Sequence, residues 1–242
     1  MAFAVVARCI ERGDLIHSYV FHFEVIWRNL GSLLEGASLT LAISVATIVF
    51  GSVIGVIVCF CQLSDRAIIR GPARAYIQFV RGTPLLVQLL WIFYGLPLVV
   101  GMAMPAIISG MVGMSFNAGA YLSEIFRSGI LAVERGQYEA ARSIGMSHAM
   151  TFRRIVAPQA FRIIVPPLAN MFIGIVKDTS LVSVIAVSEL VRRGQLIAAS
   201  TFRTMEIFTG VALIYFCMTY VLARISSMVE KRLSRGIQTA TH

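Results

Sequence analysis

The sequence predicts an all-α integral membrane protein, a helical bundle with about five transmembrane helices. Of its 242 residues, 57% are hydrophobic and only 14% are charged, and the mean hydropathy is +0.80. A soluble domain does not need so much apolar surface, whereas a lipid bilayer solvates it. Long stretches without charge alternate with short basic segments, as expected for membrane spans joined by loops. We therefore expect one transmembrane domain over residues 1–242.

Three spans are predicted in the first half of the chain. A helix needs about 20 residues to cross the hydrocarbon core, and the first charge-free stretch is long enough. Within it, Gly51 and Gly55 have the spacing that lets a second helix approach closely. The next charge-free stretch is too long for one span, and residues 101–105 supply a break. The three spans are predicted at residues 37–61, 84–101 and 105–125.

Two further spans are predicted in the second half. Pro166 and Pro167 fall inside the first of these, and each proline removes a helical hydrogen bond. We expect them to interrupt the helix, either to line a cavity or gate or as a simple kink. Residues 181–200 are amphipathic and their apolar run is too short to cross, so they form an outer or re-entrant segment. The two spans are predicted at residues 156–176 and 206–224.

The distribution of charge predicts the orientation. With the N-terminus outside, five spans place three loop or tail segments and the C-terminus in the cytoplasm. These segments hold 13 Lys and Arg against 4 Asp and Glu, whereas the outer segments hold 7 of each class. This is the positive-inside distribution. The basic residues between the spans therefore indicate topology, and nucleic acid is excluded as a partner. The cytoplasmic segments are residues 64–83, 126–154 and 224–242.

The loop at residues 126–154 carries the most distinctive motif. Ala140 and Ala141 are strong helix formers with little side-chain bulk. Gly145 suits the left-handed residue just past a helix end. A short helix with a small-residue face and a charged flank would fit into a groove of another protein. The motif comprises Glu139, Ala140, Ala141, Gly145, Ile155 and Pro158 at fixed spacing.

This pattern resembles the EAA loop of binding-protein-dependent ABC importer permeases, although Ala157 stands where that family has Leu. Two segments resemble the polar amino acid branch of that family, Arg-Gly-Thr-Pro-Leu-Leu-Val-Gln from Arg81 and Lys-Asp-Thr-Ser-Leu from Lys177. Residues 121–130 resemble the family segment that leads into the EAA loop. The resemblance extends over about residues 30–235. It implies the type I ABC importer permease fold, in the bacterial inner membrane.

The resemblance also implies partners. They are two ABC ATPase subunits, a second permease that is identical or homologous, an extracytoplasmic substrate-binding protein, and a polar amino acid as cargo. In this family the EAA loop is the coupling helix that docks on the ATPase. The coupling contact would involve Glu139, Ala140, Ala141, Arg142, Gly145 and Met146.

The sequence gives no case for an enzyme. It lacks the Gly-x-x-x-x-Gly-Lys-Ser/Thr motif, so this chain would not hydrolyse ATP by that route. We expect no cofactor in this chain, because the partner ATPase would bind ATP and Mg²⁺. Cys59 and Cys61 lie in an apolar stretch without His or acidic neighbours, so we predict packing there, with no metal site and no disulfide framework. His148 lacks a nucleophile partner.

The substrate path is predicted from the few polar residues near the spans. An amino acid zwitterion needs a partner for its carboxylate and another for its ammonium group. Glu124 could serve the ammonium group, or Glu124 and Asp178 could be ties between helices. Arg81 is expected to reach lipid headgroups. The predicted path residues are Asn117, Glu124, Asn170, Lys177 and Asp178.

Two other classes of function are weaker alternatives. An ATP-independent secondary transporter or channel predicts an internal inverted repeat, which the sequence does not show. That class also leaves the EAA-type spacing unexplained. A scaffold that only anchors a complex would not need spans that carry prolines and polar residues.

Overall fold

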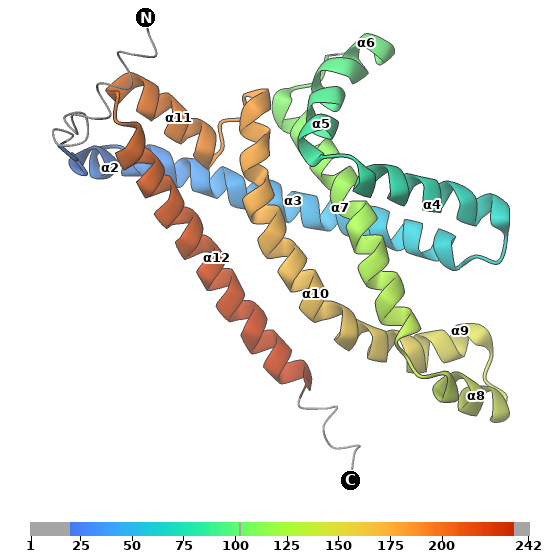
Figure 1. Ribbon diagram of the computed structural model, residues 1–242. Helices are drawn as coiled ribbons and strands as arrows, with labels where there is room; N and C mark the ends of the chain where they lie inside the picture. The colour runs from blue at the N-terminus through green and yellow to red at the C-terminus, as the bar shows by residue number, and fades with distance from the viewer. Residues whose placement is uncertain (1–19, 102, 235–242) are drawn as a thin grey trace, which may run out of the picture.

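The computed structural model describes residues 20–101 and 103–234, and the regular elements within these ranges are all helical (Figure 1). The all-α prediction is confirmed for this part of the chain; the remainder of the predicted 1–242 domain lies outside the described residues. The α-helices are α2 (Glu24–Arg28), α3 (Leu30–Leu63), α4 (Ala67–Gly82), α5 (Leu85–Leu90), α6 (Leu96–Val100), α7 (Ala106–Leu131), α8 (Arg135–Ser143), α9 (His148–Thr151), α10 (Ala157–Asp178), α11 (Leu190–Thr201) and α12 (Thr204–Ser234).

Three stretches of the described chain are long and apolar enough to cross a membrane: Leu30–Leu63, His148–Ile185 and Thr204–Arg232. A fourth is formed if the pair Ala67–Gly82 and Leu85–Val100, bent by 106°, counts as one span. Helix α7 is not among them, because small and polar residues interrupt its apolar run. It packs against α3, α4, α5 and α10, and such an enclosed helix needs less apolar surface. The count of five spans and the sides of the termini stay predictions.

Helices α3 and α7 run in the same direction and pack through glycines. A Cβ atom on Gly51 would lie 3.0 Å from Cβ of Ala118, and one on Gly55 would lie 2.9 Å from Cβ of Leu122. Because two glycines one turn apart on α3 face two residues one turn apart on α7, the two helices stay in close contact along at least one turn. The close approach predicted from the spacing of these two glycines is confirmed.

Two π-helical turns explain how prolines are accommodated. The turns at Trp91–Gly95 and Phe152–Val156 each end two residues before a proline, Pro97 and Pro158. Proline lacks an N–H group and its ring collides with the carbonyl four residues earlier. A π-turn takes up an additional residue, so the helical path continues past the clash.

Of the two alternatives predicted at Pro166 and Pro167, the broken helix is wrong, and the simple kink stays a prediction. Helix α10 is continuous through both residues, as is expected where a membrane helix satisfies its freed carbonyls locally. The sharp bend lies instead between α4 and α5, where Thr83 and Pro84 have ψ angles of 142° and 137°. The residue before a proline is disfavoured in helical conformation, so Pro84 ends α4.

The bundle has two main buried clusters. The larger one joins α3, α5, α7, α10 and a 3₁₀-helical segment, Thr179–Ile185. The other joins the first half of α3 to α11 and α12 and includes Leu33, Leu190 and Ile207. Residues 181–200 thus form a 3₁₀ turn and α11, which packs on α3 and α12 at the end of the bundle opposite α8 and α9 (Figure 1).

Candidate functional site

The short helix predicted for the coupling motif is present as α8. Gly145 follows it with a φ of 78°, in the left-handed region. The Gly145 N–H donates to the carbonyl of Arg142 at 3.0 Å, and the Met146 N–H donates to the carbonyl of Ala141 at 3.0 Å. These two bonds form a Schellman cap, in which glycine is favoured. The predicted role of Gly145 at the helix end is confirmed.

The two alanines of the motif face different ways. Ala141 is only 1% exposed, whereas Glu139, Ala140 and Arg142 are exposed. The predicted surface with both alanines is therefore wrong for Ala141, which packs inside this chain. Ile144, which sequence reasoning passed over, is 75% exposed. The sequence does carry a signal for this exposed residue, because Ile144 is an apolar residue between a polar helix and the glycine that caps it.

A cavity separates α8 from the segment that follows it. Nη2 of Arg142 lies 2.7 Å from Nε2 of His148 across this gap. Because a guanidinium group has only donors, Nε2 accepts the bond, and this contact requires a neutral imidazole with its proton on Nδ1. Burial raises the pKa of Tyr138, another wall residue. The cavity has a volume of about 490 Å³ and is lined by Arg135, Tyr138, Glu139, Arg142, His148, Thr151 and Phe152.

The α8 segment is attached to two long helices. Val133, Val156 and Ala160 form a small buried cluster against which Tyr138 packs. Just beside it, a Cβ on Gly129 would overlap the side chain of Ile164, so α7 and α10 touch there. A force applied to α8 therefore reaches both α7 and α10 through close packing.

A polar cavity lies at the α4–α5 bend, between α7 and the end of α10. Arg81 and Asp178 line it and bring opposite charges to one space, together with Asn117. Of the predicted path residues, Asn117 and Asp178 thus come together. Asn170 and Lys177 are exposed and do not line this cavity. The volume is about 490 Å³, and the remaining lining residues are Gly82, Thr83, Pro84, Leu85, Tyr121, Met171 and Leu181.

Asn117 also supports the bend. Its Nδ2 donates to Oε1 of Gln88 at 3.0 Å. Gln88 in turn donates from Nε2 to the carbonyl of Val80 at 2.8 Å and to Oγ1 of Thr83 at 2.7 Å. Because Asn117 and Gln88 are both 8% exposed, these bonds replace water contacts that neither side chain could keep. The network fixes α5 relative to α4 and α7.

Glu124 ties two helices together. Its carboxylate lies 3.9 Å from Nη1 of Arg81 in α4 and 3.5 Å from Nε of Arg127 in α7. The Arg81 guanidinium also stands 5.4 Å from the ring centre of Tyr121. Of the two roles predicted for Glu124, the structure shows the tie. Arg81 turns toward α7 and the cavity, and its expected contact with lipid headgroups stays a prediction.

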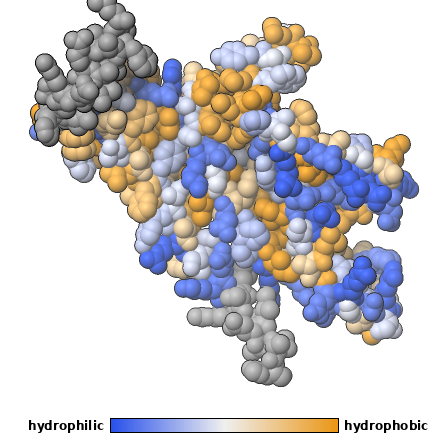
Figure 2. Space-filling view, in the orientation of Figure 1, coloured by the Kyte–Doolittle hydropathy of each residue, from blue (hydrophilic) through white to orange (hydrophobic). Residues whose placement is uncertain are grey.

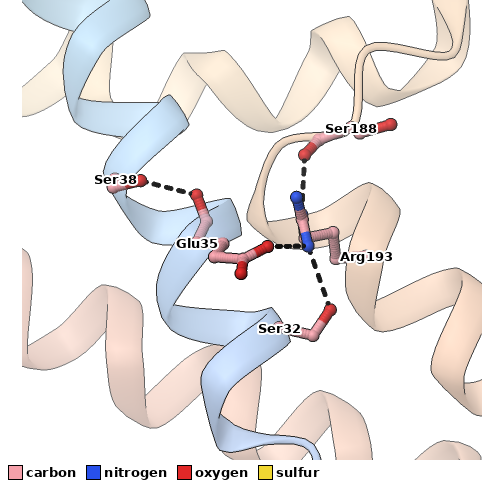
Figure 3. Close-up of polar contacts among 5 residues, drawn as sticks. All are labelled: Ser32, Glu35, Ser38, Ser188 and Arg193. Atoms are coloured by element: carbon pink, nitrogen blue, oxygen red, sulfur yellow. Dashed lines mark hydrogen bonds and ion pairs between the residues drawn. The ribbon is translucent and has the colours of Figure 1, made fainter.

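The opposite end of the bundle is held by contacts between α3 and α11 (Figure 3). Nη1 of Arg193 lies 2.7 Å from Oε2 of Glu35 and donates to Oγ of Ser32 at 3.2 Å. Its Nε donates to the carbonyl of Ser188 at 3.3 Å. A Cβ on Gly36 would lie 2.8 Å from Cα of Leu190, so only glycine permits this approach.

A buried carboxylate lies next to these contacts. Glu189 has no exposed surface and accepts bonds from the N–H groups of Val191 at 3.0 Å and Arg192 at 2.8 Å, which caps α11. The hydroxyls of Tyr215 and Thr40 donate to it at 3.1 and 3.4 Å. Burial raises the pKa of Glu189, and these bonds oppose the rise. Sequence reasoning missed this role, because its partners come from three separate helices.

Comparison with known proteins decides the family. The model of the family described as "Binding-protein-dependent transport system inner membrane component" matches residues 47–235. This chain belongs to that family. The permease is 36% identical to the probable amino-acid ABC transporter permease protein YckA of Bacillus subtilis, over 90% of this chain and 96% of the relative. It is 38% identical to the glutamine transport system permease protein GlnP of Escherichia coli K12, over 88% of this chain and 98% of that relative.

Solved structures confirm the type I importer fold. A crystal structure of an amino acid ABC transporter with histidines contains a chain that is 37% identical, with a TM-score of 0.84, covering 88% of the permease and all 100% of that chain. A chain in an inward-facing structure of the methionine transporter MetNI matches with a TM-score of 0.73 at 18% identity, covering 85% of the permease and 98% of that chain. At this low identity, the match supports the fold alone. The permease is therefore an integral membrane transport component.

Proposed function

We propose that this chain is the permease subunit of a bacterial ABC importer that moves a polar amino acid across the inner membrane. The observation that carries the proposal is α8, whose exposed Glu139, Ala140 and Ile144 project beside a segment packed onto α7 and α10. Such a helix offers a surface to a partner and a connection to the bundle. The similarity to amino-acid ABC transporter permeases supports the choice of cargo.

The motor in this proposal is a pair of separate ATPase subunits. Each would receive the α8 segment of one permease and would bind ATP and Mg²⁺, so that this chain needs no cofactor. Closure of the ATPases would push α8, and the packing at Gly129 and Ile164 would transmit the displacement to α7 and α10. The polar character of the surface over α8 and α9 suits a water-soluble partner (Figure 2).

The rest of the assembly follows from the same proposal. A second permease, identical or homologous, would complete the bundle, and an extracytoplasmic binding protein would deliver the amino acid. The α11 end would face that protein, because it lies opposite α8 and α9 (Figure 1). ATP would then be consumed at one end of the bundle while substrate enters at the other.

The cavity at the α4–α5 bend is the proposed substrate site. Arg81 would bind the substrate carboxylate and Asp178 its ammonium group, since both charges line the same space. Glu124 shares Arg81, so substrate binding would compete with this helix tie. Asn117 would position the α5 wall through Gln88.

Transport by the reconstituted assembly tests this function. The permease is placed in proteoliposomes with its co-expressed ATPase and binding protein, and uptake of labelled polar amino acids is measured with and without enclosed ATP. We expect uptake only with ATP. Uptake that is equally fast without ATP would contradict the importer and favour the secondary transporter.

An Asp178→Asn variant tests the substrate site in the same assay. We expect uptake to fall about tenfold or more, because the ammonium group loses its charged partner. Lys177→Gln is the matched control, since Lys177 is adjacent but does not line the cavity. Equal uptake by wild type and Asp178→Asn would remove Asp178 from the site without affecting the importer assignment.

A further inference from the structure

A second cavity at the α8–α9 end has a basic wall without acidic residues. Its volume is about 470 Å³, and it is lined by Ser147, Ala149, Met150, Arg153 and Arg154. It shares no lining residue with the cavity between α8 and α9. The two guanidinium groups are therefore the dominant charges of this space.

The π-helical turn at Phe152–Val156 brings both arginines to this cavity. A π-turn has more residues per turn than an α-helix, so the side chains of successive residues diverge less around the axis. Pro158 accounts for the turn, as described above. The pairing of Arg153 with Arg154 on one wall is thus built by the backbone.

Neither arginine has a carboxylate partner in the described part of the chain. Within residues 20–101 and 103–234, no ion pair or side-chain hydrogen bond involves Arg153 or Arg154. By contrast, Arg127 lies beside Glu124, and Arg193 lies beside Glu35. Two adjacent cations without a counter-charge repel each other, and one shared anion would reverse that repulsion.

The position of the cavity indicates where such an anion would come from. Both arginines lie in the apolar helical stretch His148–Ile185 and directly precede the span predicted at residues 156–176, so we expect them at the cytoplasmic edge of the membrane. Met150 is 42% exposed and Ala149 is also exposed, which gives the site apolar surface beside its charges. A phosphate group attached to an apolar body matches this combination.

We propose that this cavity binds the phosphate group of an anionic phospholipid. Arginine forks match phosphate oxygens with two parallel hydrogen bonds, and the Ser147 hydroxyl adds a donor. Basic pockets beside membrane helices are suited to anionic headgroups. The bound lipid would lie next to His148 and hence next to the contact between α9 and α8. This inference does not depend on the proposed function.

Native mass spectrometry of the full chain in mild detergent tests the site. Short-chain phosphatidylglycerol and phosphatidylcholine are added separately, and bound lipid is counted. Wild type should favour phosphatidylglycerol, and Arg153→Gln/Arg154→Gln should lose about tenfold or more of that preference, since each basic residue near an anionic headgroup contributes several-fold. Met150→Glu, which keeps both arginines but adds a carboxylate to the wall, should lose it too.

Arg66→Gln/Arg74→Gln is the matched control. It removes the same charge from two exposed arginines of the α3–α4 region and should keep the preference. If this control lost the preference for phosphatidylglycerol equally, the effect would come from net charge alone, and the proposed site would be overturned. An unchanged preference in both cavity variants would also overturn it.

Two further measurements separate other sources of the anion. Millimolar inorganic phosphate is added to wild type, and full displacement of phosphatidylglycerol would replace the lipid site with a free-phosphate site. The co-expressed ATPase is also purified with each variant. Loss of the ATPase from Arg153→Gln/Arg154→Gln, with no change in lipid binding, would assign this surface to the ATPase.

Discussion

At the α11 end of the bundle, the charged side chains described above bond to other residues of the chain. At the α8 end, several charged side chains have no partner among residues 20–101 and 103–234. Glu189 and Arg193 engage helix ends, hydroxyls and carboxylates. Glu139 and Arg154 are exposed and form no ion pair among the described residues. The difference indicates a division of roles. The charged side chains named at the α11 end find their partners within the described chain, while those named at the α8 end are available to a partner outside it.

The largest expected effect comes from Glu189→Leu. It removes the carboxylate that accepts from two part-buried N–H groups of α11 and from the Tyr215 hydroxyl, so we expect a loss of about 3 kcal/mol of stability. The measurement is thermal unfolding in detergent. Glu139→Leu at the exposed end is the control and should change stability little. Similar losses in both variants would break the comparison.

Gly36→Ala should be next in size. The new Cβ would lie 2.8 Å from backbone Cα of Leu190, which cannot move aside as a side chain can, so the cost is about 1–3 kcal/mol. Gly31→Ala, in the same helix with nothing within 4 Å, is the control and should be neutral or stabilising. Thermal unfolding of the two variants measures the contrast. A harmless Gly36→Ala would mean that α3 and α11 are less tightly packed.

The pH dependence of stability should show the burial of Glu189. Burial raises the pKa of Glu189 in the folded chain above its ordinary value of 4.5. The folded state then holds the proton more tightly, so this stabilising contribution is complete below that value and is lost as the pH rises through the raised pKa. Wild type should therefore lose stability relative to Glu189→Gln as the pH rises above 4.5 and through the raised pKa of Glu189. Parallel curves for the two proteins would show that Glu189 is not perturbed.

Gly145→Ala should have the smallest effect on stability and a local one. Alanine at a φ of 78° costs about 1 kcal/mol and would loosen the cap of α8, although there is space for its methyl group. We expect weaker ATPase co-purification with nearly unchanged thermal unfolding. Gly136→Ala, which lies inside α8 at negative φ with open space around it, is the control and should retain the ATPase. Equal ATPase retention by both variants would weaken the role of the cap.

The sequence was informative where the physics is local. The left-handed Gly145 follows from a helix end, and the close approach at Gly51 and Gly55 follows from residue spacing. Local rules failed at Pro166 and Pro167, because a helix in a bundle can satisfy the groups that proline frees. Contacts between distant segments gave no local signal. The burial of Ala141 and the bonds to Glu189 depend on which helices meet in the fold, and the spacing of residues along the sequence does not contain that information.

The same reasoning explains the partial success at the substrate path. Polar residues near spans were recognisable, and Asn117 and Asp178 do share a cavity. Arg81 was missed because its direction is set by the bend at Thr83, which turns the guanidinium toward Glu124 and Tyr121. Residue type indicates which groups need partners, but the fold decides which partners they find.

Site-specific crosslinking tests the central claim, that the exposed end of α8 receives the ATPase, most directly. Ile144→Cys and Leu196→Cys are introduced separately into a chain whose four native cysteines are replaced, and each is co-expressed with the ATPase. Ile144 is 75% exposed at the α8 end, and Leu196 is 52% exposed on α11 at the other end. We predict an ATPase crosslink from position 144 and none from position 196. A folded, transport-active complex that crosslinks equally from both positions, or from neither, would contradict the account.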